Sequence, residues 1–304
     1  MLIKVAVVQF EISQFAPQEN LAKAEQFIQQ AVAQAADLVV FPEDFIAGPL
    51  DGRVDLADFD QRYVKHFQEL ATQYHIDIVP GSIIEGDENG LYNTAYYIDR
   101  HGDILSQYRK LNLWLPERSY ITPGAGISVF ETRFGKVGLI ICWDLMFPEI
   151  FRAMVRQGVE IVICPSYWCL EDAGVGMEHD EQAEIKLVNA LCVARAFENE
   201  VVLVYANAAG KQVSEQNTST LIGQSQITVP FKGPLDIAMD NGETMIVEEV
   251  DLDVLAIAEE AYEIRSDLQK GLIGCAGPSI EITMEYEAAP QLIADRPVTR
   301  DLPV

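Results

Sequence analysis

Hydrophobic residues follow two different periods along this chain, and their alternation predicts its architecture. Short apolar runs at 2–10, 38–41 and 76–84 are rich in β-branched residues and typical of buried strands, the last interrupted by a Pro-Gly pair. Between them, apolar residues recur at helical spacing over 18–35 and 57–74. The first third of the chain therefore predicts a β-α-β-α-β order, which favours a sheet covered by helices.

The rest of the chain continues this class of pattern without sequence similarity to the first third. We expect further strands over 92–99, 104–108, 127–131, 137–141, 159–164, 201–205, 223–229, 234–239 and 244–250. We expect helices from Pro148 onward, over 180–198 and over 252–268. Asn241-Gly242 is a strong hairpin signal. Two β-α-β-type halves that face each other would form one layered domain.

The segment 136–152 contains the most informative junction. Its apolar run ends at Cys142, and Pro148 then opens a helical pattern. Open α/β sheets place their chemistry where a strand gives way to the following helix. Most free cysteines, however, are buried packing residues, so Cys142 taken alone fits either role.

Other reactive residues also follow predicted strands. Glu43 comes after Leu-Val-Val-Phe-Pro, Ser166 comes after Ile-Val-Ile-Cys-Pro, and Lys110 lies in an irregular segment after a hairpin strand. A glutamate at such a position is costly if it is buried without a partner. Glu43 taken alone therefore also fits a solvated strand end.

The familiar catalytic motifs are absent from the sequence. There is no Gly-x-Ser-x-Gly elbow, no phosphate-binding glycine loop and no His-Glu-x-x-His. Of the 4 histidines, only His179 is a candidate for a Cys–His pair. Without a histidine, a glutamate can serve as the base, and a lysine can stabilise a thiolate and an oxyanion.

Net charge and cysteine content limit the binding partners and the cellular compartment that we expect for the protein. A net charge of −26 argues against nucleic acid and anionic membranes as partners, since both require a basic face. The 5 cysteines are odd in number and form no Cys-x-x-Cys, and Cys164-x₄-Cys169 is a weak metal signal. With no signal peptide and no apolar run of roughly 20 residues, we expect a cytoplasmic protein.

Three segments together resemble the motifs of the nitrilase superfamily of carbon–nitrogen hydrolases. They are Phe-Pro-Glu43, Tyr-Arg-Lys110-Leu and Gly-Leu-Ile-Ile-Cys142-Trp-Asp-Leu-Met-Phe-Pro-Glu, in the order of the family. The last is the most specific, and Asn93-Thr94-Ala95 is one of several weaker echoes over roughly residues 3–265. The resemblance implies a four-layer α-β-β-α sandwich in a single domain.

The same resemblance implies how the chain is organised and with what it associates. We expect the hydrolase domain over 1–270 and a tail over 271–304 that packs on the domain or on a partner subunit. Family members form oligomers built from a dimer, so we expect a homodimer or a higher homo-oligomer. No metal and no organic cofactor is implied.

The site implied by the resemblance is a triad of Glu43, Lys110 and Cys142, with Glu117 as a fourth member that orients the lysine or the substrate. Cys142 would attack the carbon of an amide or nitrile while Glu43 takes the thiol proton. Lys110 and the backbone N–H of Trp143 would hold the oxyanion, and a thioester would follow.

The expected substrate pocket is less defined than the triad. The resemblance points to Trp114, Tyr167 and Trp168 as lining residues, although both aromatics after the strand also fit core packing. The loop 169–181 contains no Lys or Arg, which favours neutral or cationic substrates, with Arg118 as a possible cation.

The predicted reaction is hydrolysis of a small amide to the acid and ammonia. Cys-Trp-Asp144 is more similar to the amidase and carbamoylase branches than to nitrilases, because the aspartate follows two residues after the cysteine. Hydrolysis of a nitrile and of an N-carbamoyl amine or amino acid stay open as alternatives. A catalytically silent binding subunit is the alternative from another class.

Overall fold

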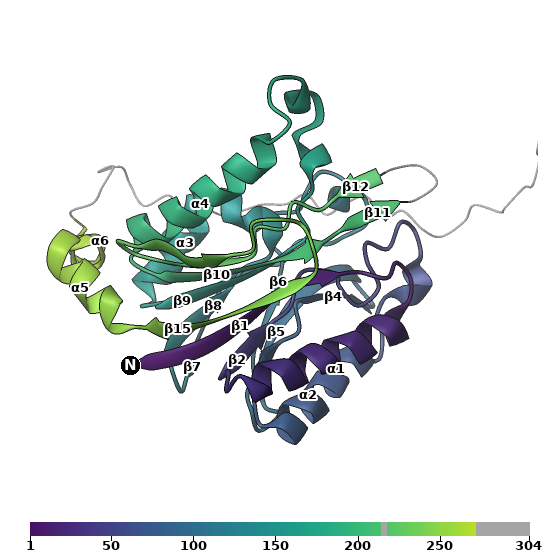
Figure 1. The fold of residues 1–304 in the computed structure, drawn as a ribbon, viewed down its shortest axis with the longest axis horizontal. Helices are drawn as coiled ribbons and strands as arrows, with labels where there is room; N and C mark the ends of the chain where they lie inside the picture. The colour runs from purple at the N-terminus through teal and green to yellow at the C-terminus, as the bar shows by residue number, and fades with distance from the viewer. Residues whose placement is uncertain (214–217, 272–304) are drawn as a thin grey trace, which may run out of the picture.

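The computed structural model describes residues 1–213 and 218–271. Its main sheet has 13 strands and curls into two facing halves, joined where β1 runs beside β10 through the pairs Phe10–Ala208 and Glu11–Ala209. Figure 1 shows the two halves face to face, with α1 and α2 outside one half and α3 and α4 outside the other. This arrangement confirms the four-layer α-β-β-α sandwich expected from the sequence.

The first half of the sheet contains seven strands. They are β1 (Leu2–Glu11), β2 (Leu38–Val40), β3 (Asp77–Val79), β4 (Ser82–Asp87), β5 (Gly90–Ile98), β6 (Ile104–Arg109) and β15 (Thr244–Asp251). The second half contains β7 (Ser128–Thr132), β8 (Gly135–Leu139), β9 (Ile161–Ser166), β10 (Val202–Ala209), β13 (Gln226–Val229) and β14 (Gly233–Ile237). A separate hairpin pairs β11 (Lys211–Val213) with β12 (Thr218–Thr220).

Helices cover the outer faces and the open end of the sandwich. They are α1 (Pro17–Ala33), α2 (Arg62–Tyr74), α3 (Pro148–Arg156), α4 (Ala183–Asn199), α5 (Asp253–Tyr262) and α6 (Ile264–Lys270). Short 3₁₀ turns occur at Val54–Leu56, Glu117–Ser119, Cys142–Met146 and Leu170–Glu178. In residues 1–213 and 218–271, no helix is both long enough and apolar enough to cross a membrane.

Strand β1 shows why the apolar runs in the sequence are continuous. Successive side chains of a strand point to opposite faces, and both faces of β1 are buried. Its odd positions, from Ile3 to Val7, join the core between the sheet halves. Its even positions, from Ala6 to Phe10, join the core beneath α1 and α2.

Several element boundaries differ from the sequence predictions for local reasons. The helix expected over 57–74 begins at Arg62, because the Asp58 carboxylate accepts hydrogen bonds from the N–H groups of Arg62 (3.1 Å) and Tyr63 (2.9 Å). The helix expected over 252–268 is divided into α5 and α6 at Glu263, whose φ is +53°.

Three further differences concern the last third of the chain. The strand expected over 223–229 begins at Gln226, and the β11–β12 hairpin was not predicted. The hairpin expected at Asn241-Gly242 is wrong, because β14 pairs with β13 and β15 pairs with β1. The predicted tail over 271–304 lies outside the described residues apart from Gly271.

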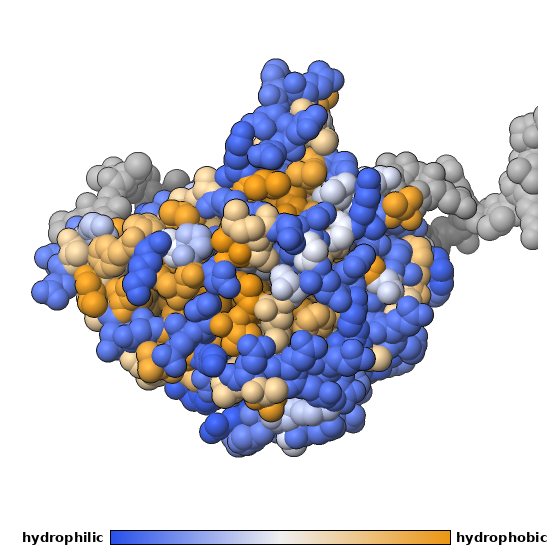
Figure 2. Space-filling view, in the orientation of Figure 1, coloured by the Kyte–Doolittle hydropathy of each residue, from blue (hydrophilic) through white to orange (hydrophobic). Residues whose placement is uncertain are grey.

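The surface is largely hydrophilic, with an apolar area on one side. Figure 2 shows apolar side chains gathered where α5, α6 and β15 lie in Figure 1. Ile257 and Tyr262 are large apolar residues of α5 that stay about half exposed, at 56% and 49%. The ring of Tyr262 stacks on Phe231 with centroids 5.4 Å apart.

Candidate active site

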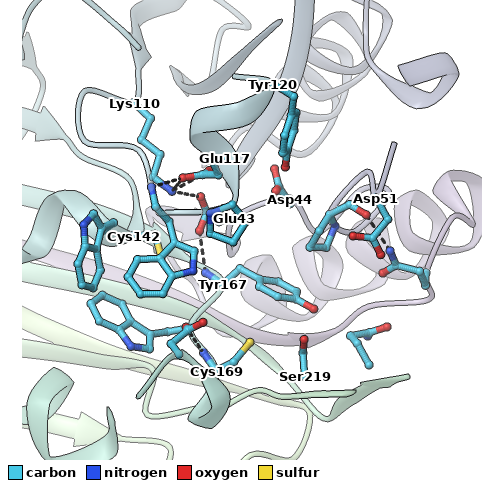
Figure 3. Close-up of a pocket in the computed structure, with 18 of the residues that line it drawn as sticks. Glu43, Asp44, Asp51, Lys110, Glu117, Tyr120, Cys142, Tyr167, Cys169 and Ser219 are labelled. Carbon is cyan, nitrogen blue, oxygen red and sulfur yellow. Dashed lines mark hydrogen bonds and ion pairs between the residues drawn. The ribbon is translucent and has the colours of Figure 1, made fainter. Parts of the chain in front are cut away.

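The segments that follow β2, β6, β8 and β9 meet at one pocket of about 280 Å³ (Figure 3). Because parallel strands end at the same edge of a sheet, residues far apart in sequence converge there. The lining residues are Gln14, Glu43, Asp44, Pro49, Asp51, Lys110, Trp114, Pro116, Glu117, Tyr120, Cys142, Trp143, Tyr167, Trp168, Cys169, Asp172, Gln212, Val213 and Ser219.

A buried ion cluster forms the inner end of this pocket. The Nζ atom of Lys110 lies 2.8 Å from Oε1 of Glu43 and 2.8 Å from Oε2 of Glu117, and the lysine side chain is 1% exposed. A buried ammonium group is tolerated when opposite charges and hydrogen bonds replace its water. The two carboxylates supply that replacement and fix the position of the cation.

Neutral donors hold the two carboxylates in place. The Asn93 amide donates to Oε1 of Glu43 (2.8 Å) and to Oε1 of Glu117 (3.1 Å). The second oxygens accept backbone N–H groups, from Tyr167 to Glu43 (2.9 Å) and from Trp114 to Glu117 (2.7 Å). Each carboxylate oxygen therefore has a partner. In the sequence, Asn93 stood out only as an echo of the family pattern.

Cys142 sits at a strained turn directly after β8. Its φ is +46°, a left-handed conformation that costs a residue with a Cβ about 1 kcal/mol or more. The chain leaves the strand through Ile141 and enters the 3₁₀ turn Cys142–Met146. This geometry turns the cysteine toward the pocket, where it is 7% exposed.

Asp144 connects this turn to the segment that contains Lys110. Its Oδ2 accepts hydrogen bonds from the N–H of Ile141 (3.0 Å) and the hydroxyl of Tyr108 (2.7 Å). Its Oδ1 accepts from the backbone N–H and the side-chain amide of Asn112, at 2.8 and 2.9 Å. One buried carboxylate thus fixes the cysteine turn against the chain on both sides of Lys110.

Glycine is required at one point beneath Glu43. Gly81, with a φ of +60°, lies between β3 and β4 and packs against the segment after β2. A Cβ at this position would lie 1.8 Å from the carbonyl oxygen of Pro42. A side chain there would displace the residue that immediately precedes Glu43.

The environment shifts the pKa values of the inner groups in a consistent way. Burial raises the pKa of the Cys142 thiol well above its usual range, and the nearby Glu43 charge adds to the shift. Burial also raises the pKa of Glu43, although Lys110 opposes the shift. Burial lowers the pKa of Lys110, but Glu117 and Glu43 outweigh it and the net shift is upward. These shifts favour the neutral thiol form of Cys142 over the thiolate.

The three aromatic residues predicted from the sequence to line the pocket, Trp114, Tyr167 and Trp168, all do so. The Trp143 ring lies between Trp114 and Trp168, with ring centroids 4.3 and 5.5 Å away. Trp168 is 1% exposed and donates its indole N–H to Glu184 (2.6 Å), so its role at the pocket is mainly structural.

Two residues that the sequence offered as candidates lie elsewhere. His179, the candidate for a Cys–His pair, is exposed and does not line the pocket. Arg118, the possible substrate-binding cation, is also absent from the lining and donates to the carbonyl of Leu113 (3.1 Å). Within the described part of the chain, no histidine lines this pocket.

The outer end of the pocket contains residues that sequence reasoning missed. They are Asp44, Asp51, Tyr120 and the β11–β12 residues Gln212 and Ser219. Asp172 also lines this end, and it lies in the loop 169–181 that the sequence had already linked to the choice of substrate. Asp44 is adjacent to the predicted Glu43, but nothing in the sequence indicated the direction of its side chain. Among residues 1–213 and 218–271, no group of three or more His, Cys, Asp or Glu side chains is arranged to hold a metal ion.

Solved structures and curated relatives agree with this fold. Saccharomyces cerevisiae Nit3, a member of branch 10 of the nitrilase superfamily, superposes with a TM-score of 0.74 at 26% identity, covering 86% of this chain and 94% of Nit3. An N-carbamoylputrescine amidase of Oryza sativa subsp. japonica is 31% identical over 296 residues, covering 90% of this chain and 96% of the relative. A 2-oxoglutaramate amidase of Bacillus subtilis is 29% identical, with 88% and 98% covered.

These similarities in sequence and structure identify the class of protein as a hydrolase with the nitrilase-type fold. The carbon–nitrogen hydrolase family model matches residues 4–258. The chain therefore belongs to the carbon–nitrogen hydrolase family.

Proposed function

We propose that this enzyme hydrolyses the C–N bond of a small amide through a thioester on Cys142. The observation that carries the proposal is the buried Lys110, held 2.8 Å from Glu43 in the pocket onto which Cys142 opens. A base, a cation and a thiol are the three groups that cysteine-dependent acyl transfer requires in the absence of histidine.

In the first half of the reaction, Glu43 takes the thiol proton as Sγ attacks the carbonyl carbon. Glu43 and Cys142 line the same pocket, and the charge of Glu43 contributes to the raised pKa of the thiol, which supports Glu43 as the acceptor of that proton. Lys110 and the backbone N–H of Trp143 stabilise the negative oxygen of the tetrahedral intermediate. When the intermediate collapses, the C–N bond breaks, the nitrogen takes the proton from Glu43, and ammonia leaves.

In the second half, water attacks the thioester carbon and gives its proton to Glu43. The C–S bond then breaks, the acid leaves, and the proton returns to the Cys142 sulfur. Glu117 acts as a positioning residue. Its Oε2 atom lies 2.8 Å from Lys110 and also accepts the backbone N–H of Trp114, which fixes its position. The raised thiol pKa is consistent with proton transfer during attack rather than with a preformed thiolate.

An N-carbamoyl amine is the second candidate substrate. The same steps apply, because its terminal carbamoyl group also releases ammonia from a carbonyl carbon. The 31% identity to the rice N-carbamoylputrescine amidase supports this candidate. Nitrile hydrolysis, the remaining alternative, is an outcome of the same test.

Ammonia release from ω-amides, N-carbamoyl amines, N-carbamoyl acids and nitriles tests the proposal. We expect turnover of amides or carbamoyl compounds, and we expect Cys142→Ala to reduce kcat by about 10⁴-fold or more while circular dichroism stays native. His179→Ala is the matched control, since this exposed histidine does not line the pocket. Activity that survives Cys142→Ala but is lost in His179→Ala would contradict the assignment.

We also infer a homodimer or a higher homo-oligomer. The half-exposed apolar side chains of α5 support an apolar contact on that face, and sedimentation velocity tests it (Figure 2). A monomer at micromolar concentration would contradict it. The cytoplasmic setting stays a prediction from the sequence.

A further inference from the structure

The described residues at the outer end of the pocket are acidic and include no basic side chain. Asp44, Asp51 and Asp172 line it together with the hydroxyl-bearing Tyr120. Among the lining residues of the described chain, Lys110 is the single basic side chain, and Glu43 and Glu117 already neutralise it. A substrate that reaches past the reacting carbon therefore meets negative charge.

Asp44 differs from the other two carboxylates because one of its oxygens is buried without a hydrogen-bond partner among the described residues. Its φ of +53° turns the chain directly after Glu43, and in Figure 3 its carboxylate lies beside the hydroxyl end of Tyr120. The Oδ1 atom is buried and has no hydrogen-bond partner among the described residues. The side chain as a whole is partly exposed and lines the pocket, so a cation can reach its accessible side. A cation bound there stabilises a carboxylate whose buried oxygen receives no donor from the protein.

Asp51 and Asp172 extend the acidic lining toward solvent. Asp51 is exposed at the mouth of the pocket. One carboxylate oxygen of Asp172 accepts a hydrogen bond from the N–H of Cys169 (2.9 Å), and burial raises the pKa of Asp172 to about 7. These two residues attract a cation to the mouth of the pocket. Asp44 is the carboxylate that has an oxygen without a hydrogen-bond partner among the described residues.

We propose that Asp44 is the receptor for a cationic group at the far end of the substrate, so that the enzyme selects ω-ammonium amides or N-carbamoyl amines over neutral and acidic ones. This inference rests on the proposed hydrolysis at Cys142. A dicarboxylic monoamide would bring its free carboxylate toward the exposed Asp51, where like charges are unfavourable, and would give Asp44 no opposite charge to pair with. An ammonium group at the same place forms a charge-assisted hydrogen bond.

The protonation of Asp44 gives the proposal a second readout. Burial raises the pKa of Asp44 well above its usual range, and the charges of Glu43 and Glu117 add to the shift while Lys110 opposes it. Tyr120 also faces this carboxylate. The empty pocket therefore holds the Asp44 proton more tightly than solvent does. A bound ammonium group favours the carboxylate, so binding of a cation releases a proton.

The kinetic test uses three amides of matched length: 5-aminopentanamide, hexanamide and adipamic acid. We expect kcat/KM for 5-aminopentanamide to exceed that for hexanamide by at least about 30-fold, with adipamic acid the poorest substrate. In Asp44→Asn, this cation preference should fall by at least about 10-fold, mainly through a higher KM. Asp51→Asn should reduce it by about 2- to 5-fold, because Asp51 is exposed.

Asp103→Asn is the matched control, because Asp103 is an exposed aspartate in the β5–β6 turn and does not line the pocket. Its cation preference should equal that of the unaltered enzyme. Equal kcat/KM for the cationic and neutral amides, or a preference unchanged in Asp44→Asn, would overturn the inference and leave the proposed function intact. Loss of ammonia release from every amide, with the fold native, would instead overturn the proposed function.

Calorimetry covers the case in which Asp44→Asn does not fold. Titration of 5-aminopentanamide into Cys142→Ala, in buffers of different ionisation enthalpy, should show release of a proton at pH 7. Hexanamide should show none. Equal proton release with both amides would contradict an ammonium group at Asp44.

Discussion

The inner and outer ends of the pocket differ in whether their charged side chains are paired within the protein. At the inner end, Lys110 lies 2.8 Å from both Glu43 and Glu117, and backbone N–H groups donate to their second oxygens. At the outer end, Asp44 has a buried oxygen without a partner among the described residues, and Asp51 faces solvent. The carboxylates of the inner end are paired within the protein, whereas those of the outer end have no cation beside them among the described lining residues.

This difference separates two kinds of contribution to the reaction. A preorganised set of charges stabilises the transition state without reorganising, so damage to it lowers kcat. A site that is completed by the ligand contributes to binding and to the choice of substrate, so damage to it raises KM. Substitutions at the two ends should therefore be distinguishable by kinetics alone.

Lys110→Gln is expected to have the largest effect, because it removes the cation from a buried cluster. We expect kcat to fall by about 10³-fold or more, and the free energy of unfolding to fall by about 3–5 kcal/mol as Glu43 and Glu117 are left unpaired. Steady-state ammonia release and urea unfolding measure the two effects.

The control for this change is Lys65→Gln. Lys65 is an exposed lysine of α2 that donates to the carbonyl of Asp60 (2.9 Å), so its loss should change neither quantity measurably. If Lys110→Gln keeps a near-native kcat, the inner end is a structural ion cluster and not catalytic machinery.

Asn93→Ala is expected to have a smaller effect at the same end. The Asn93 amide donates to both carboxylates, at 2.8 and 3.1 Å, and its loss loosens them without removing a charge. We expect kcat to fall by about 10- to 100-fold with little change in KM. Asn89→Ala, at an exposed turn between β4 and β5, should behave as the unaltered enzyme. A rise in KM alone would place Asn93 with the outer end instead.

The two ends also differ in how far the sequence predicts them. Glu43 and Cys142 directly follow apolar runs that can only be buried strands, so their positions at the sheet edge follow from the pattern. The sequence could indicate Lys110 only through the resemblance to a family, because the segment around it follows neither period. The structure places all three in one pocket, and their roles stay proposals.

The outer end could not be predicted because backbone geometry and distant contacts build it. Asp44 reaches its position through a φ of +53°, which a one-residue pattern does not reveal. Gln212 and Ser219 come from a two-stranded hairpin too short to show a clear alternation. The helix break at Glu263 has the same origin, since a left-handed residue interrupts an otherwise periodic segment.

Glu200 provides the comparison outside the pocket, and its expected effect is the smallest. This residue, at the end of α4, is buried, its Oε2 has no hydrogen-bond partner among the described residues, and Arg265 Nε lies 3.9 Å away. Burial, with the neighbouring Glu259 carboxylate adding to the shift, raises the pKa of Glu200 to about 7. Glu200 does not line the pocket, so its substitution should change the free energy of unfolding and leave kcat and KM unchanged.

The sign of the effect follows from the raised pKa. The folded chain binds the Glu200 proton more tightly than the unfolded chain, so this stabilisation is complete below about pH 4.5 and is lost as the pH rises through about 7. The loss amounts to at most about 1.4 kcal/mol per pH unit. Glu200→Gln removes this titration, so the stability of the variant relative to the unaltered protein should rise between pH 5 and pH 8. Urea unfolding at the two pH values measures the difference, and a difference that stays constant would show that Glu200 is ionised throughout.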